Sequence, residues 1–345
     1  MTIQDLGFKG ELPEINKGSV GRVIVEHKHM YRISDGNTEY LGELTGKFRF
    51  EATSRNDYPA VGDFVLFSKL DNGKALIHEV LPRSSSFARQ AAGLKTEEQI
   101  IATNIDYVFI VNALNDDFNI RRLERYLTLA YESGASPIFI FTKKDLCKNI
   151  EIKLHEAEKI AFGVPMFAIS SIEREGIEEL QPYLKKGDTI TLVGSSGVGK
   201  STLLNTLMGV EIQKTQEIRN DDDKGKHTTT HRELFSLPNG ALIIDTPGMR
   251  ELQLWSSGES ISTVFQDIDE LVSQCKFTDC SHNNEPGCAI KKALENGSLE
   301  NERYESYKKL QKEIAYHLRK QDVHLMRAEK EKWKKIKKSL KTNKI

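Results

Sequence analysis

The sequence lacks any long apolar run, and this absence bears first on membranes. No stretch approaches the roughly 18 to 20 apolar residues that a membrane-spanning helix needs. Residues 1–18 also lack the basic start and the apolar core of a secretion signal. We therefore expect a cytoplasmic protein that makes no contact with a membrane.

Cysteine is scarce, with four among 345 residues, which excludes a disulfide-stapled secreted domain. Three of the four lie in the pattern Cys275-x4-Cys280-x-His282-x5-Cys288. Three thiolates and one imidazole form the ligand set of a closed tetrahedral zinc site. We predict one structural Zn2+ at these four residues, because unligated buried cysteines would leave the spacing unexplained. Cys147 is interpreted as a structural thiol.

A strong charge of either sign is also missing. The formal net charge is −1, so composition alone predicts no nucleic-acid partner. The charge is nevertheless uneven, because residues 327–345 hold nine Lys or Arg against two acids. Such a tail is able to contact phosphates or to remain a solvated end.

The first part of the chain shows the spacing of a small β-barrel. Short alternating segments at residues 20–27, 29–34, 39–52 and within 61–81 are separated by turn signals. We predict an OB-like barrel over residues 1–92, a fold that often binds RNA. The residues expected to supply charge and stacking are Arg22, Lys28, Arg32, Lys47, Phe48, Arg49 and Phe50. An ordinary solvated barrel surface is the alternative.

The middle of the chain changes to a βαβ rhythm, and the end becomes helical. Apolar runs alternate with helical segments from residue 104 to about 248, which predicts a parallel sheet covered by helices over residues 93–256. Beyond this, Leu310, Ile314 and Leu318 repeat at helical spacing. We therefore predict a multidomain fold that ends in a mostly helical zinc-binding domain at 257–345.

A phosphate-binding loop follows one of the apolar strands. The residues Gly194, Ser195, Ser196, Gly197, Val198, Gly199, Lys200 and Ser201 fit G-x-x-x-x-G-K-[ST], and Thr202 continues into a helix-compatible segment. The main-chain N–H groups of such a loop wrap phosphates, its lysine reaches the β- and γ-phosphates, and its serine ligates Mg2+. A plain glycine-rich turn is the alternative.

Two further strand ends complete a nucleotide site. Asp245 ends an apolar strand and is expected to hold the Mg2+ shell, with Gly248 close to the γ-phosphate. The segment Thr142, Lys143, Lys144, Asp145 follows another strand, and the carboxylate of Asp145 pairs with guanine N1–H and N2–H2, which adenine lacks. Residues 168–171 are expected to add main-chain contacts to the base. We conclude that the site binds GTP and GDP, with an ATPase as the weaker alternative.

The order of these motifs is inverted, because the guanine-reading segment comes before the phosphate loop and Asp245 comes last. This order resembles a circular permutation. Together with the barrel and the Cys/His cluster, it resembles the bacterial ribosome small subunit-dependent GTPase A family over nearly the whole chain. Family-like stretches are residues 61–65, 104–106, 225–234, 245–252 and 275–290.

The resemblance implies a GTPase that hydrolyses GTP to GDP and phosphate during late maturation of the small (30S) ribosomal subunit. It implies 16S rRNA as a partner, slow intrinsic turnover stimulated by the subunit, and a monomer. Two positions depart from the family pattern. Thr142 stands where Asn is usual, and Thr45 stands where Arg is frequent. We expect the first change to weaken base affinity and the second to remove one RNA contact.

Residues 220–231 have the composition of a switch loop, although an ordinary surface loop has the same features. We expect Thr229, within a run of three threonines, to reach Mg2+ and the γ-phosphate. Met249 stands where a water-orienting Gln occurs in Ras-like enzymes, which predicts slow turnover. We hypothesise that His227 or a group of the ribosome orients the attacking water, with Lys200 stabilising the transferred phosphoryl group.

The cluster at Cys275 follows Gly248 by only about 27 residues. We therefore hypothesise that the nucleotide state moves the zinc module and thereby controls affinity for the subunit. Two rival functions stay open. One is a permuted GTPase that serves the large subunit, and the other is a nucleotide-gated RNA-binding scaffold without useful hydrolysis.

Overall fold

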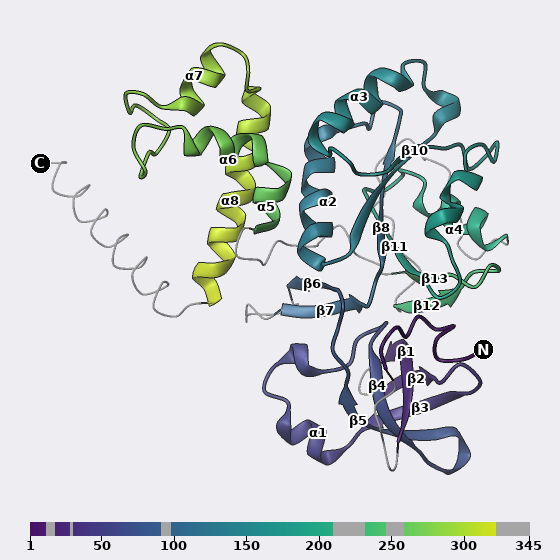
Figure 1. Cartoon of the computed structure of the whole chain (residues 1–345). Coiled ribbons are helices and arrows are strands. Elements are labelled where there is room, and N and C mark those ends of the chain that lie inside the picture. The colour runs from purple at the N-terminus through teal and green to yellow at the C-terminus, as the bar shows by residue number, and fades with distance from the viewer. Residues whose placement is uncertain (12–17, 28–29, 91–97, 210–231, 246–258, 322–345) are drawn as a thin grey trace, which may run out of the picture. The chain divides into compact units, whose positions relative to one another are not determined.

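The computed structural model describes residues 1–11, 18–27, 30–90, 98–209, 232–245 and 259–321 (Figure 1). These residues belong to two compact units. The first unit is Met1–Ala91 with Glu97–Gln253, and the second is Ala92–Thr96 with Leu254–Ile345. No helix in the described ranges is long and apolar enough to cross a membrane. The barrel and the α/β sheet thus share a unit, while the domain boundaries at residues 92 and 256 stay predictions.

Five strands of the first unit close into a barrel. Their bounds are β1 Ser19–His27, β2 Met30–Ser34, β3 Glu39–Leu44, β4 Phe64–Lys69 and β5 Lys74–Val80. The order is β1-β2-β3-β5-β4, and β4 pairs back to β1 with Val65 opposite Gly21. Val23, Ile33 and Phe67 are fully buried inside, as the alternation predicts. The OB-like barrel is confirmed.

The predicted strand over residues 39–52 is wrong in its second half. Residues Gly46–Glu51 form the helix α1, because the Thr45 hydroxyl accepts a hydrogen bond from the Phe48 N–H and so caps the helix. Phe48 packs into the barrel core and is not available for stacking on a base. Phe50 is 91% exposed and remains a candidate.

Arg22 is also not the surface RNA contact that the sequence predicted. Its guanidinium is fully buried and donates hydrogen bonds to the carbonyls of Leu6, Gly62 and Asn104 and to the Thr189 hydroxyl. Burial lowers the pKa of Arg22 to about 10, so the group remains a cation at neutral pH. Arg32, Lys47 and Arg49 are exposed, and Lys28 lies outside the described residues.

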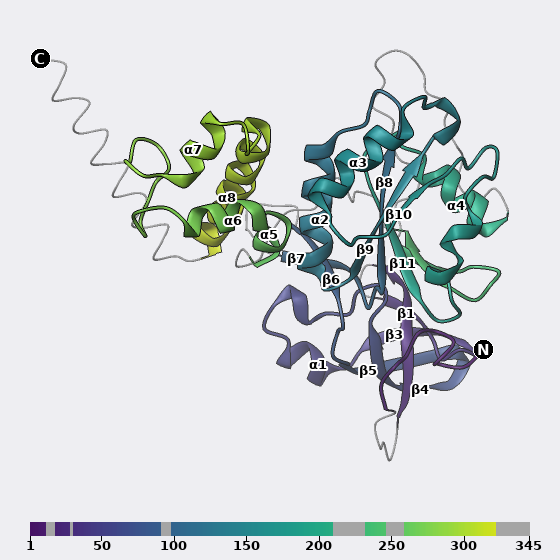
Figure 2. The same cartoon turned by 45° about the horizontal axis from the view of Figure 1, so that its top comes forward.

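The α/β part of the first unit carries the predicted nucleotide motifs. Its strands are β8 Tyr107–Ala113, β9 Ser136–Thr142, β10 Met166–Ala168, β11 Thr189–Val193, β12 Glu233–Ser236 and β13 Leu242–Asp245, in the order β10-β9-β8-β11-β13-β12. All neighbours are parallel except β12 with β13. The helices α2 Ile120–Ser133 and α3 Ile150–Ile160 cover one face, and α4 Lys200–Met208 covers the other (Figures 1 and 2). The predicted parallel α/β domain is confirmed.

The barrel and the α/β sheet are hydrogen-bonded to each other. Strand β1 pairs antiparallel with β12, with Val25 opposite Glu233, so eleven strands form one continuous sheet. Beside this pairing, the Arg232 guanidinium lies 3.2 Å from the Glu26 carboxylate. The strands β6 Ser86–Gln90 and β7 Glu98–Thr103 pair antiparallel and form a separate two-stranded sheet, which the sequence did not predict. In the sequence they stand between the last barrel strand, β5, and the first strand of the α/β part, β8.

The second unit is helical, as predicted. Its helices are α5 Glu259–Val264, α6 Gln266–Ser273, α7 Ala289–Glu295 and α8 Asn301–Gln321. Leu310 and Ile314 of α8 are buried, while Leu318 is 37% exposed. Arg303 of α8 binds both carboxylate oxygens of Asp267 on α6 at 2.6 and 2.7 Å. This bidentate pair fixes how the two helices pack.

Candidate functional site

The phosphate loop joins the end of β11 to the start of α4, where the sequence places it. Gly194 has φ 151°, and a Cβ there would lie 2.3 Å from the Val111 carbonyl oxygen. Gly199 has φ 97° and directly precedes α4. Both positions therefore require glycine, because a side chain would be strained or would clash. The loop meets the free N–H groups of a helix N-terminus, which is an arrangement suited to binding phosphate.

Lys200 is turned back onto the phosphate loop. Its ammonium donates hydrogen bonds to the carbonyls of Gly194, at 2.8 Å, and Ser195. A side chain held over the loop in this way lies on the side where phosphates bind. Ser201 and Thr202 follow in the first turn of α4, next to the same loop.

Thr142 links the guanine-reading segment to the phosphate loop. Its side chain is almost fully buried, and its hydroxyl donates a hydrogen bond to the Val198 carbonyl. Gly199 approaches closely as well, since a Cβ there would lie 3.5 Å from the Thr142 hydroxyl oxygen. Thr142 therefore links the predicted base-reading segment to the predicted phosphate loop.

The rest of the Thr142–Asp145 segment follows β9, with Lys143 and Lys144 half-buried and Asp145 exposed. Lys143 adopts a left-handed conformation with φ 59°, and Asp145 follows in the turn Lys144–Leu146. The hydrogen bond from Lys144 to Glu175, at 2.5 Å, raises the pKa of the lysine. The Lys144 N–H also donates to the Ile169 carbonyl. This brings Ile169 beside the turn that carries Asp145, while the contact of residues 168–171 with the base stays a prediction.

Ser171 ends this neighbouring segment. Its hydroxyl oxygen is buried and has no hydrogen-bond partner among the described residues. A buried hydroxyl without a partner is unusual in a folded protein. Its position next to the Asp145 turn is consistent with a polar ligand completing its hydrogen bonding.

A charged cluster at the phosphate loop was missed by the sequence analysis. Arg122, in the first turn of α2, donates to the Ser195 hydroxyl at 2.5 Å and to both Asp117 oxygens at 2.9 and 3.0 Å. The Ser195 hydroxyl in turn donates to Asp117 at 3.2 Å. The Asn119 side chain caps α2 by accepting a hydrogen bond from the Arg122 N–H. This cap fixes where the helix begins and so places Arg122 in its first turn. The Ser195 hydroxyl is therefore fixed by two residues outside the phosphate loop, Arg122 and Asp117.

The remaining nucleotide motif lies on the strand next to β11. Asp245 ends β13, and Thr191 of β11 donates to the Ile244 carbonyl at 3.0 Å. The strands that carry Asp245 and the phosphate loop are thus adjacent and end at the same edge of the sheet. Gly248, His227 and Thr229 lie outside the described residues.

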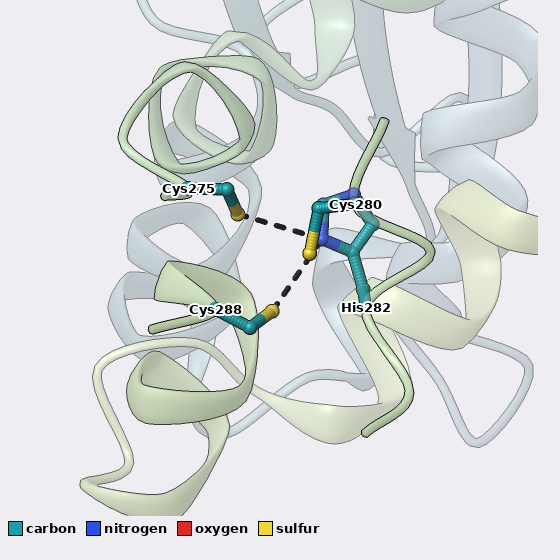
Figure 3. Close-up of side chains that lie close together, drawn as sticks. All are labelled: Cys275, Cys280, His282 and Cys288. Carbon is teal, nitrogen blue, oxygen red and sulfur yellow. Dashed lines mark hydrogen bonds between the residues drawn. The ribbon is translucent and has the colours of Figure 1, made fainter. Parts of the chain in front are cut away.

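The four predicted metal ligands converge in the second unit (Figure 3). Their ligand atoms all lie within 4.8 Å of one another. The Nδ1 atom of His282 lies 3.6 Å from the Cys275 sulfur and 3.5 Å from the Cys288 sulfur. Sulfur atoms about 3.8 Å apart are expected around one tetrahedral zinc ion. Donor set and spacing therefore fit a closed site that could hold one metal ion.

Local backbone structure explains this convergence. Cys275 follows the end of α6, and Cys288 caps the start of α7. His282 has φ 60°, which turns the intervening loop back toward the cysteines. Glu285 holds the loop by accepting hydrogen bonds from the main-chain N–H groups of Ser281 and Asn283, each at 3.0 Å.

Sequence comparison places these features among known proteins. The pattern of the RsgA GTPase family matches residues 80–255. The pattern of ABC transporters matches residues 177–336, a range that includes the phosphate loop found in both classes. "Small ribosomal subunit biogenesis GTPase RsgA 1" of Oceanobacillus iheyensis is 49% identical over 326 residues, covering 94% of this chain and 93% of the relative. "Small ribosomal subunit biogenesis GTPase RsgA 2" of Listeria monocytogenes is 46% identical, covering 99% and 98%.

Two solved structures are similar in fold. YjeQ from Thermotoga maritima has a TM-score of 0.64 at 30% identity, covering 86% of this chain and 99% of that one. YloQ, described as a circularly permuted GTPase, has a TM-score of 0.62 at 24% identity, covering 89% and 98%. A circular permutation is thus described for a solved structure with this fold.

Proposed function

This chain belongs to the RsgA GTPase family, and from that premise we propose that it hydrolyses GTP to GDP and phosphate while bound to the small ribosomal subunit, in late maturation of that subunit. The observation that carries the proposal is the junction between Thr142 and Val198, where the guanine-reading segment and the phosphate loop meet in one site. The names of the relatives support the choice of subunit.

Each group of the site has a role in this proposal. Gly194 to Ser201 and the start of α4 bind the phosphates, Ser201 and Asp245 hold Mg2+, and Lys200 stabilises the transferred phosphoryl group. Asp145 selects guanine, with Lys143 and Lys144 shaping the turn around it. Mg2+ bound with GTP would neutralise charge on the phosphates.

We assign the water-orienting role to His227 and contact with Mg2+ to Thr229. Comparing His227→Ala with the wild type in single-turnover hydrolysis on 30S subunits tests the first assignment. An unchanged rate at equal nucleotide affinity would remove His227 from the mechanism.

We also propose that the Cys275, Cys280, His282 and Cys288 cluster holds one structural Zn2+, and that the exposed basic residues of the barrel bind 16S rRNA. The family's small-subunit role and the fit of the donor set support these assignments. A cytoplasmic monomer is proposed as the working form.

Phosphate release with and without purified 30S subunits tests the main proposal. We expect slow release by the chain alone and a large stimulation by 30S subunits but not by 50S subunits. Equal rates in all three conditions would favour the nucleotide-gated scaffold, and stimulation by 50S subunits alone would favour the large-subunit alternative.

The base preference has its own test. Asp145→Asn should lose GTP affinity and gain affinity for xanthosine triphosphate, because the amide pairs with the extra carbonyl of xanthine. Retention of full GTP affinity by this variant would contradict the role of Asp145.

A further inference from the structure

A groove with a volume of about 540 Å3 lies between α3 and the chain that leads from it into β10. Leu154 of the helix and Val164 and Met166 of the following chain provide its apolar lining. It belongs to the α/β part of the first unit, and none of its lining residues is in a nucleotide motif. The nucleotide site therefore does not account for this groove.

The helix side of the groove is acidic. Glu151, His155 and Glu158 line it and are spaced i, i+4 and i+7, which places them on one face of α3. Both glutamates are exposed, and the His155 Nδ1 atom lies 3.8 Å from a Glu158 oxygen. No lysine or arginine lines this groove among the residues that the structure describes.

Two lysines of α3, Lys153 and Lys159, do not line the groove. Lys153 donates hydrogen bonds to the carbonyls of Leu114, at 2.7 Å, and Asn115, at 3.2 Å. Its ammonium also lies 5.3 Å from the centre of the Phe118 ring. Lys153 is therefore bonded on the side of the helix opposite to Glu151 and Glu158.

Large apolar side chains are exposed beside the acidic face. Phe162 is 93% exposed between the groove residues Ala161 and Gly163, and Ile152 of α3 is 60% exposed. Exposed aromatic and aliphatic groups next to a groove are typical of protein interfaces, where aromatic residues contribute much of the affinity.

We propose that this groove docks a cationic, partly apolar segment of a protein of the small ribosomal subunit. The inference rests on the proposed function, because it assumes that the chain binds this subunit. The subunit presents an RNA polyanion and proteins, and Glu151 and Glu158 repel phosphates while they attract lysine and arginine. Phe162 and the apolar lining contact the aliphatic parts of the same segment. The barrel and this groove thus bind different components of one particle.

Reversing the charge of the groove distinguishes protein docking from RNA docking, because it should lower the affinity for 30S subunits in the first case and raise it in the second. The double variant Glu151→Lys/Glu158→Lys is compared with Glu156→Lys, an exposed acid on a different face of the same helix. Affinity for purified 30S subunits is measured by cosedimentation with a non-hydrolysable GTP analogue. We expect the double variant to lose about tenfold in affinity and the control to change less than about twofold. Intrinsic GTP hydrolysis and the melting temperature should match the wild type.

An increase in affinity of the double variant would mean that RNA faces the groove, and equal affinity of all three chains would mean that no charged partner docks there. Either result overturns the docking while the wild-type chain still binds subunits. Failure of the wild-type chain itself to bind 30S subunits would overturn the proposed function and this docking together.

Photocrosslinking identifies the partner directly. Phe162 is replaced with a benzophenone amino acid, and the chain is irradiated on purified 30S subunits. We expect a crosslink to a lysine- or arginine-rich segment of one ribosomal protein, which the Glu151→Lys/Glu158→Lys change abolishes. A crosslink to 16S rRNA alone, or none from a chain that still cosediments, would contradict the proposal.

Discussion

The Thr142 hydroxyl donates a hydrogen bond to the Val198 carbonyl, and this bond joins the end of β9 to the phosphate loop after β11. The two residues are 56 positions apart in the sequence, in the order that the permutation produces. The residue expected to weaken base affinity thus also holds the predicted phosphate loop.

Replacing Thr142 with Val should weaken nucleotide binding. Valine keeps the shape but leaves the buried Val198 carbonyl without its donor, which costs about 1–3 kcal/mol. We expect GDP affinity to fall about tenfold in calorimetric titration, while Thr142→Ser keeps the donor and binds like the wild type. Equal GDP affinity of the Val variant and the wild type would show that the bond does not support the loop.

Arg122 should support nucleotide binding through Ser195. Arg122→Met and Ser195→Ala each remove the hydrogen bond between them and should each weaken GDP binding by about five- to tenfold. The double variant should lose less affinity than the sum of the two single losses, because both changes remove the same Arg122–Ser195 hydrogen bond. Arg122→Lys should restore part of the affinity, and kcat should stay within about twofold. Additive losses in the double variant would exclude a shared role.

Zinc should be required for the helical unit. Purified chain should contain about one equivalent of zinc, and Cys288→Ser should lose the metal and part of the helical circular dichroism signal. Cys147→Ser, the same change at a cysteine outside the cluster, should keep both. Less than about half an equivalent of zinc in chain never exposed to chelators would contradict the assignment.

The barrel should lose stability in acid through Asp35. Burial alone would raise the pKa of Asp35, but hydrogen bonds from Lys69 and from the N–H groups of Thr38 and Asn37 lower it to about 2. Because the folded-state pKa lies below the unfolded value, the stabilisation is present above about pH 4 and is lost as the pH falls through 2.

The Asp35→Asn variant tests this prediction. We expect it to be about 1–2 kcal/mol less stable than the wild type at pH 7 in urea unfolding, and the difference to shrink between pH 4 and pH 2. Asp71→Asn, in an exposed turn of the same barrel, should show neither effect. A difference that stays constant with pH would mean that the Asp35 charge contributes nothing.

The sequence predicted those parts of the site that local spacing specifies. The phosphate loop and the Cys275–Cys288 cluster each occupy one short stretch, so the residue types and their order carry the information. The strand predicted through residues 46–51 was wrong because Lys47-Phe48-Arg49-Phe50 alternates like a strand, while the cap at Thr45 starts a helix. A six-residue helix is too short to show helical periodicity.

Long-range contacts could not be predicted in this way. Arg122 and Ser195 are 73 residues apart and meet only because β8 and β11 are neighbours in the sheet. Arg22 has the spacing of an outward strand residue, yet it is buried because the N-terminal segment and β11 cover it. Such contacts depend on the completed fold and leave no local pattern in the sequence.

The continuous sheet through β1 and β12 has a consequence for folding. Strand β12 lies at the edge of the nucleotide sheet and gains its outer partner, β1, only when the barrel has formed. Arg22 likewise donates hydrogen bonds to the carbonyl of Gly62, just before β4 of the barrel, and to the carbonyl of Asn104, just before β8 of the nucleotide sheet. The barrel and the nucleotide sheet should therefore unfold as one cooperative transition, with a separate zinc-dependent transition for the helical unit. In heating experiments, GTP should raise the melting temperature of the barrel as well, because the barrel unfolds together with the nucleotide sheet.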